Sequence, residues 1–482
     1  MKFSGANRRF QAFLLILGCL FIGLQNIKAQ EFDGKDFWLG YMSTFADPTI
    51  EMQLNIISDT AATVTVEVPR AGTPYSVTFQ LSPNVLYTHT LPTNLVSNNA
   101  RSHVKRNTGV HVTSDANIIV YIGNNQDYSS DAATAIPTPA LGTQYEVIAY
   151  SALTLTRSAT FIIVGTEDNT TIDLTYNGWT ANNAGDRVRN KGDQETITLN
   201  KGQLFTVIAY TAIPITPPED VNNISSDLTG TIINADKPVA VFGGNECAYA
   251  GECPFCDHMF EQVRPLKSWG YRYNIAPTYK VPVVSTDLVK FYATEDNTVI
   301  SIAGGVTLNL NAQQSYMMEV GSPIYAESNK PIHVSQYLKG STCNTPAGEI
   351  DPLLMDNIPE NQYTTKFLYG SSSYGRYSRH YTTVVFETGE EGSLRLNGNP
   401  VTFAAPGVQP IPGSNFSVGY IQINGNRSFV LESLTGARMS VYVYGYGVEE
   451  AYGYTAGGKI IDLCYVEADD VTVCYNEPAE IS

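Results

Sequence analysis

Hydrophobic and polar residues alternate along most of this chain, and the alternation predicts β-strands. Clear runs are TVTVEV at 63–68, TIDLTY at 171–176 and VISI at 299–302. Successive side chains of a strand point to opposite faces, so a period of two buries one face and leaves the other in water. The sequence contains no long run of apolar residues at helical spacing. We therefore predict an all-β protein.

One strand-turn-strand segment occurs twice in the sequence. GTEDNTTIDL spans 165–174, and ATEDNTVISI spans 293–302. Looser copies of this hairpin lie at 57–68 and 387–398. A second element, a turn followed by a strand of small and β-branched residues, recurs at 114–125, 235–245, 328–340 and 435–447. Self-similarity of this kind is typical of repeat architectures, so we predict four divergent β-rich repeats.

A third element joins consecutive repeats: an aspartate, then a proline, then an aromatic residue eight positions after the proline. Its three copies are Asp131, Pro137 and Tyr145; Asp257, Pro265 and Tyr273; and Asp351, Pro359 and Phe367. Neither a Ser/Gly-rich nor a Pro-rich linker separates the repeats, and such tight connections favour a rigid assembly. We predict β-sandwich-like modules packed in one rigid assembly, with a propeller-like ring as the alternative.

The N-terminal residues have the parts of a signal peptide. Three basic residues precede an apolar run at 12–24 that is too short to span a bilayer comfortably, and cleavage is expected after Ala29. Acylation at Cys19, as in a lipoprotein, is the alternative. The expected organisation is a signal peptide at 1–29, β-repeats at 30–126, 127–256, 257–350 and 351–455, and a linker with the start of a further β-domain at 456–482.

The charge of the chain narrows the classes of partner. The formal net charge is −17, and removal of the signal peptide, which holds four basic and no acidic residues, changes it to −21. A nucleic-acid partner is not expected, because such proteins need basic surfaces. No later stretch is apolar for 18 residues, so we expect no transmembrane span in the mature chain.

The repeated TEDNT segment is interpreted as a turn. Asp and Asn tolerate turn geometry and bond to their own backbone. The alternative is an acidic cation site at Glu167 and Asp168, or at Glu295 and Asp296. Neither copy has the full spacing of a calcium-binding loop. We therefore expect neither a metal ion nor a cofactor.

Six cysteines follow the signal peptide: Cys247, Cys253, Cys256, Cys343, Cys464 and Cys474. An even number in an exported chain predicts disulfides, and six cysteines allow fifteen pairings. Proximity and position within the repeats favour Cys247–Cys256, Cys253–Cys343 and Cys464–Cys474. The alternatives are a zinc site that also uses His258 and a redox-active pair of Cys253 with Cys256.

The segment YGSSSYGRYSRHY, at 369–381, has the composition of a recognition surface. Tyrosines supply large contact area at low entropic cost, and Ser and Gly supply adaptable polar contacts. Its candidate ligand-binding residues are Tyr369, Tyr374, Arg376, Tyr377, Arg379 and Tyr381. The alternative is an ordinary loop that joins two strands.

No catalytic motif is recognisable in the sequence. The histidines lie in neither a nucleophile elbow nor a metal-binding spacing, and His258 is expected to be structural. A glycosidase site would need two carboxylates brought together from distant segments, which keeps a carbohydrate-active protein as an alternative. We expect a protein that is not an enzyme.

Several motifs, taken in order, resemble the N-terminal domain family of the IgGFc-binding protein. They are GKDFWLGYM at 34–42, GVHVTSDANIIVYIGNN at 109–125, AIPTPALGTQYEVIAY at 135–150 and CDHMFEQVRPLKSWGYRY at 256–273. The resemblance extends over about 34–454. The cleavage region and the tail resemble those of exported Bacteroidetes surface proteins. The family resemblance implies an extracellular binding protein, with Fc among the ligands to test, and it assigns no binding residue.

These observations predict an exported, non-catalytic binding or adhesion protein at the cell surface or outside the cell. Its expected partner is an extracellular glycoprotein, glycan or protein. The alternatives are a structural scaffold that presents neighbouring domains and a carbohydrate-active β-protein.

Overall fold

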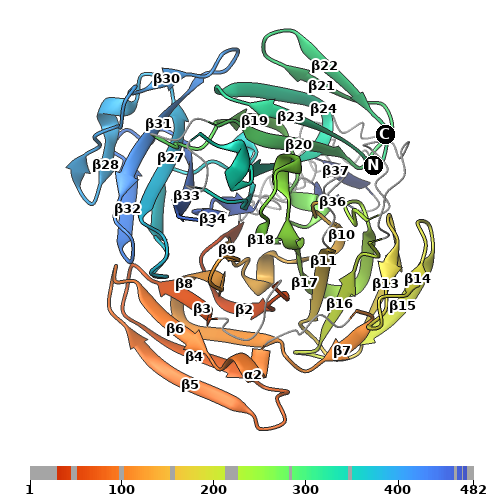
Figure 1. The fold of residues 1–482 in the computed structure, drawn as a ribbon. Helices are drawn as coiled ribbons and strands as arrows, with labels where there is room; N and C mark the ends of the chain where they lie inside the picture. Colours follow the sequence, from red (N-terminus) through yellow and green to blue (C-terminus); the bar gives the residue numbers. More distant parts are fainter. Residues whose placement is uncertain are drawn as a thin grey trace, which may run out of the picture. The chain divides into compact units, whose positions relative to one another are not determined.

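The computed structural model describes most of the chain between its two ends. The described residues are 30–44, 51–96, 102–151, 158–211, 226–281, 285–345 and 350–460, with the backbone of β36 (Cys464–Ala468) and β37 (Val471–Cys474). Nearly all of their regular structure is strand (Figure 1), and the one α-helix among them, α2 (Thr93–Val96), has four residues. The predicted all-β class is confirmed. The predicted signal peptide lies outside the described residues.

The chain divides into two compact units, and residues 30–463 form the larger one. The described part of the smaller unit is the antiparallel hairpin of β36 and β37, in which Cys464 lies opposite Cys474 in the backbone register. The side chains of these two cysteines lie outside the described residues, so the Cys464–Cys474 disulfide stays a prediction.

Repeats 1 to 3 of the larger unit are each built on one long strand. The long strands are β8 (Val110–Asn125), β17 (Ile232–Ala248) and β24 (Ile324–Leu338). The N-terminal half of each pairs with β4 (Ala62–Val68), β12 (Thr170–Thr175) or β21 (Thr298–Ile302). The C-terminal half of each pairs with β3 (Glu51–Ile57), β11 (Ala159–Gly165) or β20 (Asp287–Ala293). Each long strand therefore belongs to both halves of a curled sheet, which gives the predicted sandwich-like module.

The recurring turn before each predicted strand lies in the middle of a long strand. Its Asp or Asn side chain accepts a backbone N–H from the neighbouring hairpin. These bonds are Thr63 N to Asp115 Oδ1 (2.7 Å), Thr171 N to Asp236 Oδ1 (2.8 Å) and Val299 N to Asn329 Oδ1 (2.7 Å). The recurring Asp or Asn therefore marks the point where the long strand passes from one half of the sheet to the other. Its side chain forms a hydrogen bond to the adjacent strand at that point.

The fourth repeat departs from this plan, in agreement with its looser sequence. Its long strand is divided into β32 (Ser428–Ser433) and β33 (Met439–Gly447). These two strands lie in separate sheets. The first has the order β26 (Lys366–Gly370), β32, β28 (Leu394–Leu396), β29 (Asn399–Pro400), and the second has the order β30 (Gln409–Pro410), β31 (Phe416–Ile423), β27 (Arg379–Glu387), β33, β34 (Glu450–Thr455). The two halves that are joined in the other repeats are therefore independent sheets here.

One short strand of each repeat lies innermost. From here on we count each of these strands, with the loop before it, as part of the repeat whose recurring strand it pairs with. These strands are β9 (Asp131–Thr134), β18 (Asp257–Gln262), β25 (Leu354–Asp356) and β34 (Glu450–Thr455). Strands β9 and β25 each contact both β18 and β34, so the four make a closed cycle. Three of them are labelled near the middle of Figure 1. The sandwich-like modules are thus arranged as a propeller-like ring.

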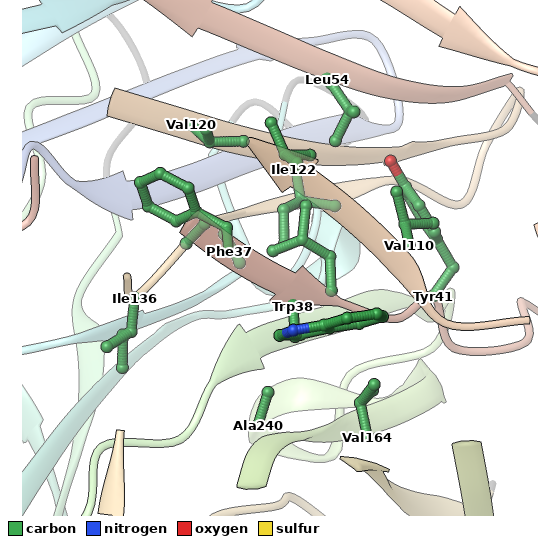
Figure 2. Packing of buried hydrophobic residues seen from close by; sticks show 14 of the residues in the cluster. Phe37, Trp38, Tyr41, Leu54, Val110, Val120, Ile122, Ile136, Val164 and Ala240 are labelled. Atoms are coloured by element: carbon green, nitrogen blue, oxygen red, sulfur yellow. The ribbon is translucent and has the colours of Figure 1, made fainter. Parts of the chain in front are cut away.

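Apolar side chains fill every junction between neighbouring repeats. Trp38 of β2 (Gly34–Leu39), in repeat 1, packs with Val164 and Ala240 of repeat 2 (Figure 2). The other three junctions hold Tyr150 with Tyr337, Leu338 with Tyr444, and Tyr454 with Tyr121. Burial of apolar surface at all four junctions stabilises a single packed assembly.

The Asp, Pro and aromatic residues of the joining element have separate structural roles. Pro137 and Pro265 lie against the first strand of the repeat before them. A Cβ on Gly34 would lie 2.5 Å from Pro137 Cβ, and one on Gly142 would lie 2.6 Å from Pro265 Cβ. The Tyr145 hydroxyl donates to the carbonyl of Val239 at 2.7 Å within its own repeat. The proline therefore packs one repeat against the previous one, and the aromatic residue fixes the sheet that follows.

The strands do not stop at the predicted repeat boundaries. Strands β9 and β18 follow the boundaries at 126/127 and 256/257, yet they pair with β8 and β17 of the preceding repeat. Strand β35 (Lys459–Ile460) pairs with β1 (Gln30–Glu31) and joins the two ends of the larger unit. Pairing across each boundary couples neighbouring repeats through backbone hydrogen bonds, and the boundaries themselves stay predictions.

Candidate functional site

Four loops lead into the innermost strands. They comprise residues 126–130, 249–256, 339–353 and 448–449, and we call them the central loops. Residues 346–349 of the third loop lie outside the described residues. Because the innermost strands contact one another in a cycle, the loops that precede them are brought together from all four repeats.

Buried carboxylates connect the first central loop to its neighbours. Glu450 Oε1 accepts the backbone N–H of Tyr128, and Glu450 Oε2 accepts the hydroxyl of Ser130. Asp257 Oδ1 accepts the backbone N–H of Ser130 at 2.7 Å. The Tyr377 hydroxyl donates to Ser130 Oγ at 2.8 Å. Repeats 2 and 4 therefore fix the conformation of a loop that belongs to repeat 1.

Two disulfides hold the second and third central loops. Cys247 is bonded to Cys256, and Cys253 is bonded to Cys343. These are two of the three predicted pairings, and they are confirmed. Their sulfur atoms are not available as zinc ligands or as the predicted alternative redox pair. The Cys253–Cys343 bond is a covalent link between repeats 2 and 3.

Hydrogen bonds also join the two disulfide-bonded loops. The Gly340 N–H donates to the carbonyl of Ala250 at 3.1 Å, and the Thr342 hydroxyl donates to the carbonyl of Pro254 at 2.9 Å. The two loops are therefore docked by hydrogen bonds as well as by the disulfide, and their shape is formed before any ligand arrives.

Three large hydrophobic side chains project from the central loops. Tyr128 is 55%, Phe255 58% and Val448 66% exposed, and each lies in a different loop. Tyr128 and Phe255 also have left-handed backbone conformations, with φ of 65° and 71°. Bulky residues rarely adopt this conformation, and strained positions of this kind concentrate at functional sites. Exposed apolar side chains on loops of fixed conformation are typical of a contact surface.

The predicted recognition segment is only partly at the surface. Tyr369, Tyr377 and Tyr381 are buried in the core, with exposures of 0%, 6% and 3%. A ligand at the surface does not reach these side chains. Arg379 is half-buried and lies over the ring of Tyr446 at 5.9 Å. Four of the six candidate residues are thus packed against other parts of the protein, which the composition of the segment did not indicate.

The other two candidates lie beside the first central loop. The Tyr374 hydroxyl donates to Asp127 Oδ1 at 2.7 Å, and Arg376 Nε donates to the same oxygen at 2.9 Å. The Arg376 guanidinium also lies 5.3 Å from the centre of the Tyr128 ring. The segment therefore extends the surface that Tyr128 begins. Sequence reasoning missed Tyr128, Phe255 and Val448, although each lies in a loop that follows one of the recurring strands.

The TEDNT segments have the contacts of the predicted turns. Asp168 Oδ1 accepts the backbone N–H of Lys201, and Asp296 Oδ1 accepts that of Ala312, both at 3.1 Å. Asn169, which follows Asp168, has a φ of 55° in the left-handed region that turns require. Within the described part of the chain, no group of three His, Cys, Asp or Glu side chains is placed to hold a metal ion.

Three carboxyl groups beneath the central loops are buried, and burial raises the pKa of each. Burial raises the pKa of Asp351 to about 7. Burial also raises the pKa of Glu450 to about 7, although the hydrogen bonds from Ser130 and from the Tyr128 N–H oppose the rise. Burial raises the pKa of Asp257 well above its usual range, and the neighbouring Glu450 and Asp351 add to this rise.

The free energy of unfolding of the wild type should fall as the pH rises, and replacing Glu450 with glutamine is expected to make this fall smaller. The folded protein holds the Glu450 proton up to a pH of about 7, against 4.5 for the ordinary group. The stabilisation from this raised pKa is fully present below the pKa of Glu450 in the unfolded chain. It is lost as the pH rises through 7, because a carboxyl group ionises more easily in the unfolded chain than in the folded protein. Between pH 5 and 8 the wild type should lose about 1 to 3 kcal/mol relative to the Glu450→Gln variant.

Urea unfolding at several pH values measures this difference. Glu391→Gln, in an exposed turn of the same repeat, is the control and should follow the wild type. Parallel pH profiles for the wild type and Glu450→Gln would contradict the prediction.

These features define a class: a disulfide-bonded, all-β repeat protein with preformed loops at the centre of its ring. The family model described as IgGFc binding protein matches residues 131–445, which is more than half of the chain. The chain therefore belongs to the IgGFc-binding protein family. It is also 23% identical over 444 residues to the human IgGFc-binding protein, an alignment that covers 90% of this chain and 7% of that protein. The chain thus spans a small part of that relative's length. None of the helices among the described residues is long and apolar enough to cross a membrane.

Proposed function

We propose that this protein is an exported, non-catalytic binding or adhesion protein whose central loops contact a protein or glycoprotein outside the cell. The observation that carries the proposal is the exposure of Tyr128, Phe255 and Val448 on preformed loops from three repeats. Membership of the IgGFc-binding family supports a binding role, and the two disulfides support export to an oxidising compartment.

The physical reason is that a preformed apolar surface binds at low entropic cost. Tyr and Arg are enriched among the residues that dominate binding energy. The Tyr374 hydroxyl donates to the Asp127 carboxylate, and the Arg376 guanidinium lies over the ring of Tyr128. The hydrogen bonds to Glu450 and the disulfides hold this surface in place, so little ordering is required when a ligand binds.

The test begins with an array of glycoproteins, glycans and human IgG Fc, with the mature chain as the probe. For a ligand found there, the triple variant Tyr128→Asn, Phe255→Asn and Val448→Ser should weaken binding about 30-fold or more. Asparagine tolerates left-handed backbone, so the loops should keep their conformation.

The control carries the same kinds of substitution at exposed hydrophobic residues away from the central loops. It is Tyr316→Asn, Leu434→Asn and Val306→Ser. The control should bind like the wild type, and both variants should keep the wild-type melting temperature. Equal affinity of the two triple variants would contradict the proposal. Absence of any ligand on the array at micromolar concentration would favour the scaffold alternative.

A further inference from the structure

A hollow lies at the seam where the first and fourth repeats meet. Its volume is about 250 Å³. Its walls come from β3 and β8 of repeat 1, from residues 364–368 and 430 of repeat 4, and from the chain segments 32–33 and 456–458 that close the ring. Seven separate parts of the sequence therefore meet around one cavity, which local sequence patterns do not reveal.

Polar residues with charges of both signs line this hollow. Among the described residues, Asp59, Asn84 and Lys366 line the hollow, are exposed and make no side-chain hydrogen bond. Asp33 Oδ2 accepts from Asn117 Nδ2 at 2.8 Å, which leaves the Oδ1 atom of Asp33 available. Acceptors from repeat 1 thus face a cationic donor from repeat 4.

The floor of the hollow is apolar and its frame is fixed. Phe367 is buried beneath it, and Ile119 and Val430 are half-buried at its sides. The Ser58 hydroxyl donates to the carbonyl of Asn117, and the Asn84 N–H donates to the carbonyl of Ser58, both at 2.7 Å. These bonds join the three segments of repeat 1 that hold Asp59, Asn84 and Asn117, so the arrangement of this side of the hollow does not depend on a ligand.

We infer that this seam binds one saccharide ring. A sugar presents hydroxyl groups that both donate and accept, together with an apolar C–H face, and the hollow offers carboxylates, an amide, an ammonium group and an apolar floor. Its volume lies just below the roughly 300–1,000 Å³ of sites for drug-sized ligands, which favours a single ring. Two carboxylates disfavour a phosphate. This site is distinct from the central loops and does not rest on the function proposed for them.

The test uses free monosaccharides and their methyl glycosides: galactose, N-acetylgalactosamine, fucose, mannose and N-acetylneuraminic acid. Binding to the full mature chain is followed by saturation-transfer NMR and calorimetry, and at least one sugar should bind with a Kd of about 1 mM or tighter. Asp59→Asn should weaken that binding about tenfold or more, because the acceptor loses its charge and one acceptor oxygen is replaced by a donor.

Thr365→Trp should abolish binding by filling the hollow, since Thr365 is an exposed lining residue. The matched controls are Glu391→Gln, which removes a charge elsewhere in repeat 4, and Thr90→Trp, which adds the same bulk at an exposed position of repeat 1. Both controls should bind like the wild type.

The outcomes separate the sources of the sugar. Methyl glycosides that bind as well as free sugars would support a terminal residue of a glycan, and binding of the free sugars alone would support a free saccharide. Failure of every sugar to bind, or binding that Thr365→Trp leaves unchanged, would overturn the inference. Displacement of the sugars by free amino acids at equal concentration would overturn the ligand class.

Discussion

Replacing Asp131 with alanine is expected to destabilise the ring more than any other single substitution in an innermost strand. Asp131 Oδ1 accepts the backbone N–H groups of Ala132 (2.8 Å) and Gly453 (3.2 Å). Oδ2 accepts those of Phe260 and Leu354, both at 3.1 Å. These four donors lie in β9, β34, β18 and β25, so one carboxyl group joins the innermost strands of all four repeats. The carboxyl group is fully buried.

The size of the effect follows from the donors that would be left without partners. Each buried unsatisfied N–H costs about 1–3 kcal/mol, so we expect the free energy of unfolding to fall by roughly 4 kcal/mol or more. Urea unfolding measures it. Asp115→Ala is the control, because it removes a carboxylate that accepts the Thr63 N–H at the exposed surface, and it should destabilise the protein much less than Asp131→Ala.

If Asp131→Ala does not fold, Asp131→Asn provides the second measurement. The asparagine keeps one acceptor oxygen, so about half of the bonds survive, and the loss should fall between that of Asp115→Ala and that of the alanine variant. Amide hydrogen exchange should then rise at the donors that lose their acceptor. An Asp131→Asn variant as stable as Asp115→Ala, with unchanged exchange at Phe260, Leu354 and Gly453, would contradict this account.

Removing the Cys253–Cys343 disulfide is expected to cost more than removing the Cys247–Cys256 disulfide. The first bond closes a sequence separation of 90 residues and the second closes one of 9. The loop-entropy relation gives about 4.6 and about 2.6 kcal/mol for loops of these lengths, so the two losses should differ by about 2 kcal/mol. The longer disulfide also crosses between repeats 2 and 3, so its loss should loosen their junction.

Paired alanine variants and calorimetric or urea unfolding measure the two losses. Each pair is the control for the other, because both remove two cysteines from the same loop region. A variant that lacks all four of these cysteines should lose more stability than either pair variant. An equal or reversed order would show that contacts made within the short loop outweigh the entropy of the long one.

The local features of this protein could be predicted because their causes are local. Alternation at 63–68 and 171–176 reports a strand with one buried face, and both segments are strands. The TEDNT turns repeat because the hairpin repeats, and Asp168 bonds to the backbone only 33 residues away. The cysteine pairings were predicted from proximity in the sequence and from position within the repeats, and two of the three are present.

The candidate surface was predicted less well, because composition does not show which side chains a neighbouring repeat covers. Tyr374 and Tyr377 are three residues apart in one tyrosine-rich segment. Tyr377 bonds to Ser130 of repeat 1 and is buried, whereas Tyr374 bonds to Asp127 at the surface. The residues that decide this difference are about 250 positions earlier in the chain, so no local pattern contains the information.

By itself, the sequence determined the all-β class, the presence of repeats, the family and the positions of the turns, because strand period and turn chemistry act over a few residues. Tertiary structure alone decided the closed ring, the hub at Asp131, the exposure of Tyr128, Phe255 and Val448, and the hollow at the seam. Each of these depends on which repeats pack together, and burial at such a junction is a property of two distant segments at once.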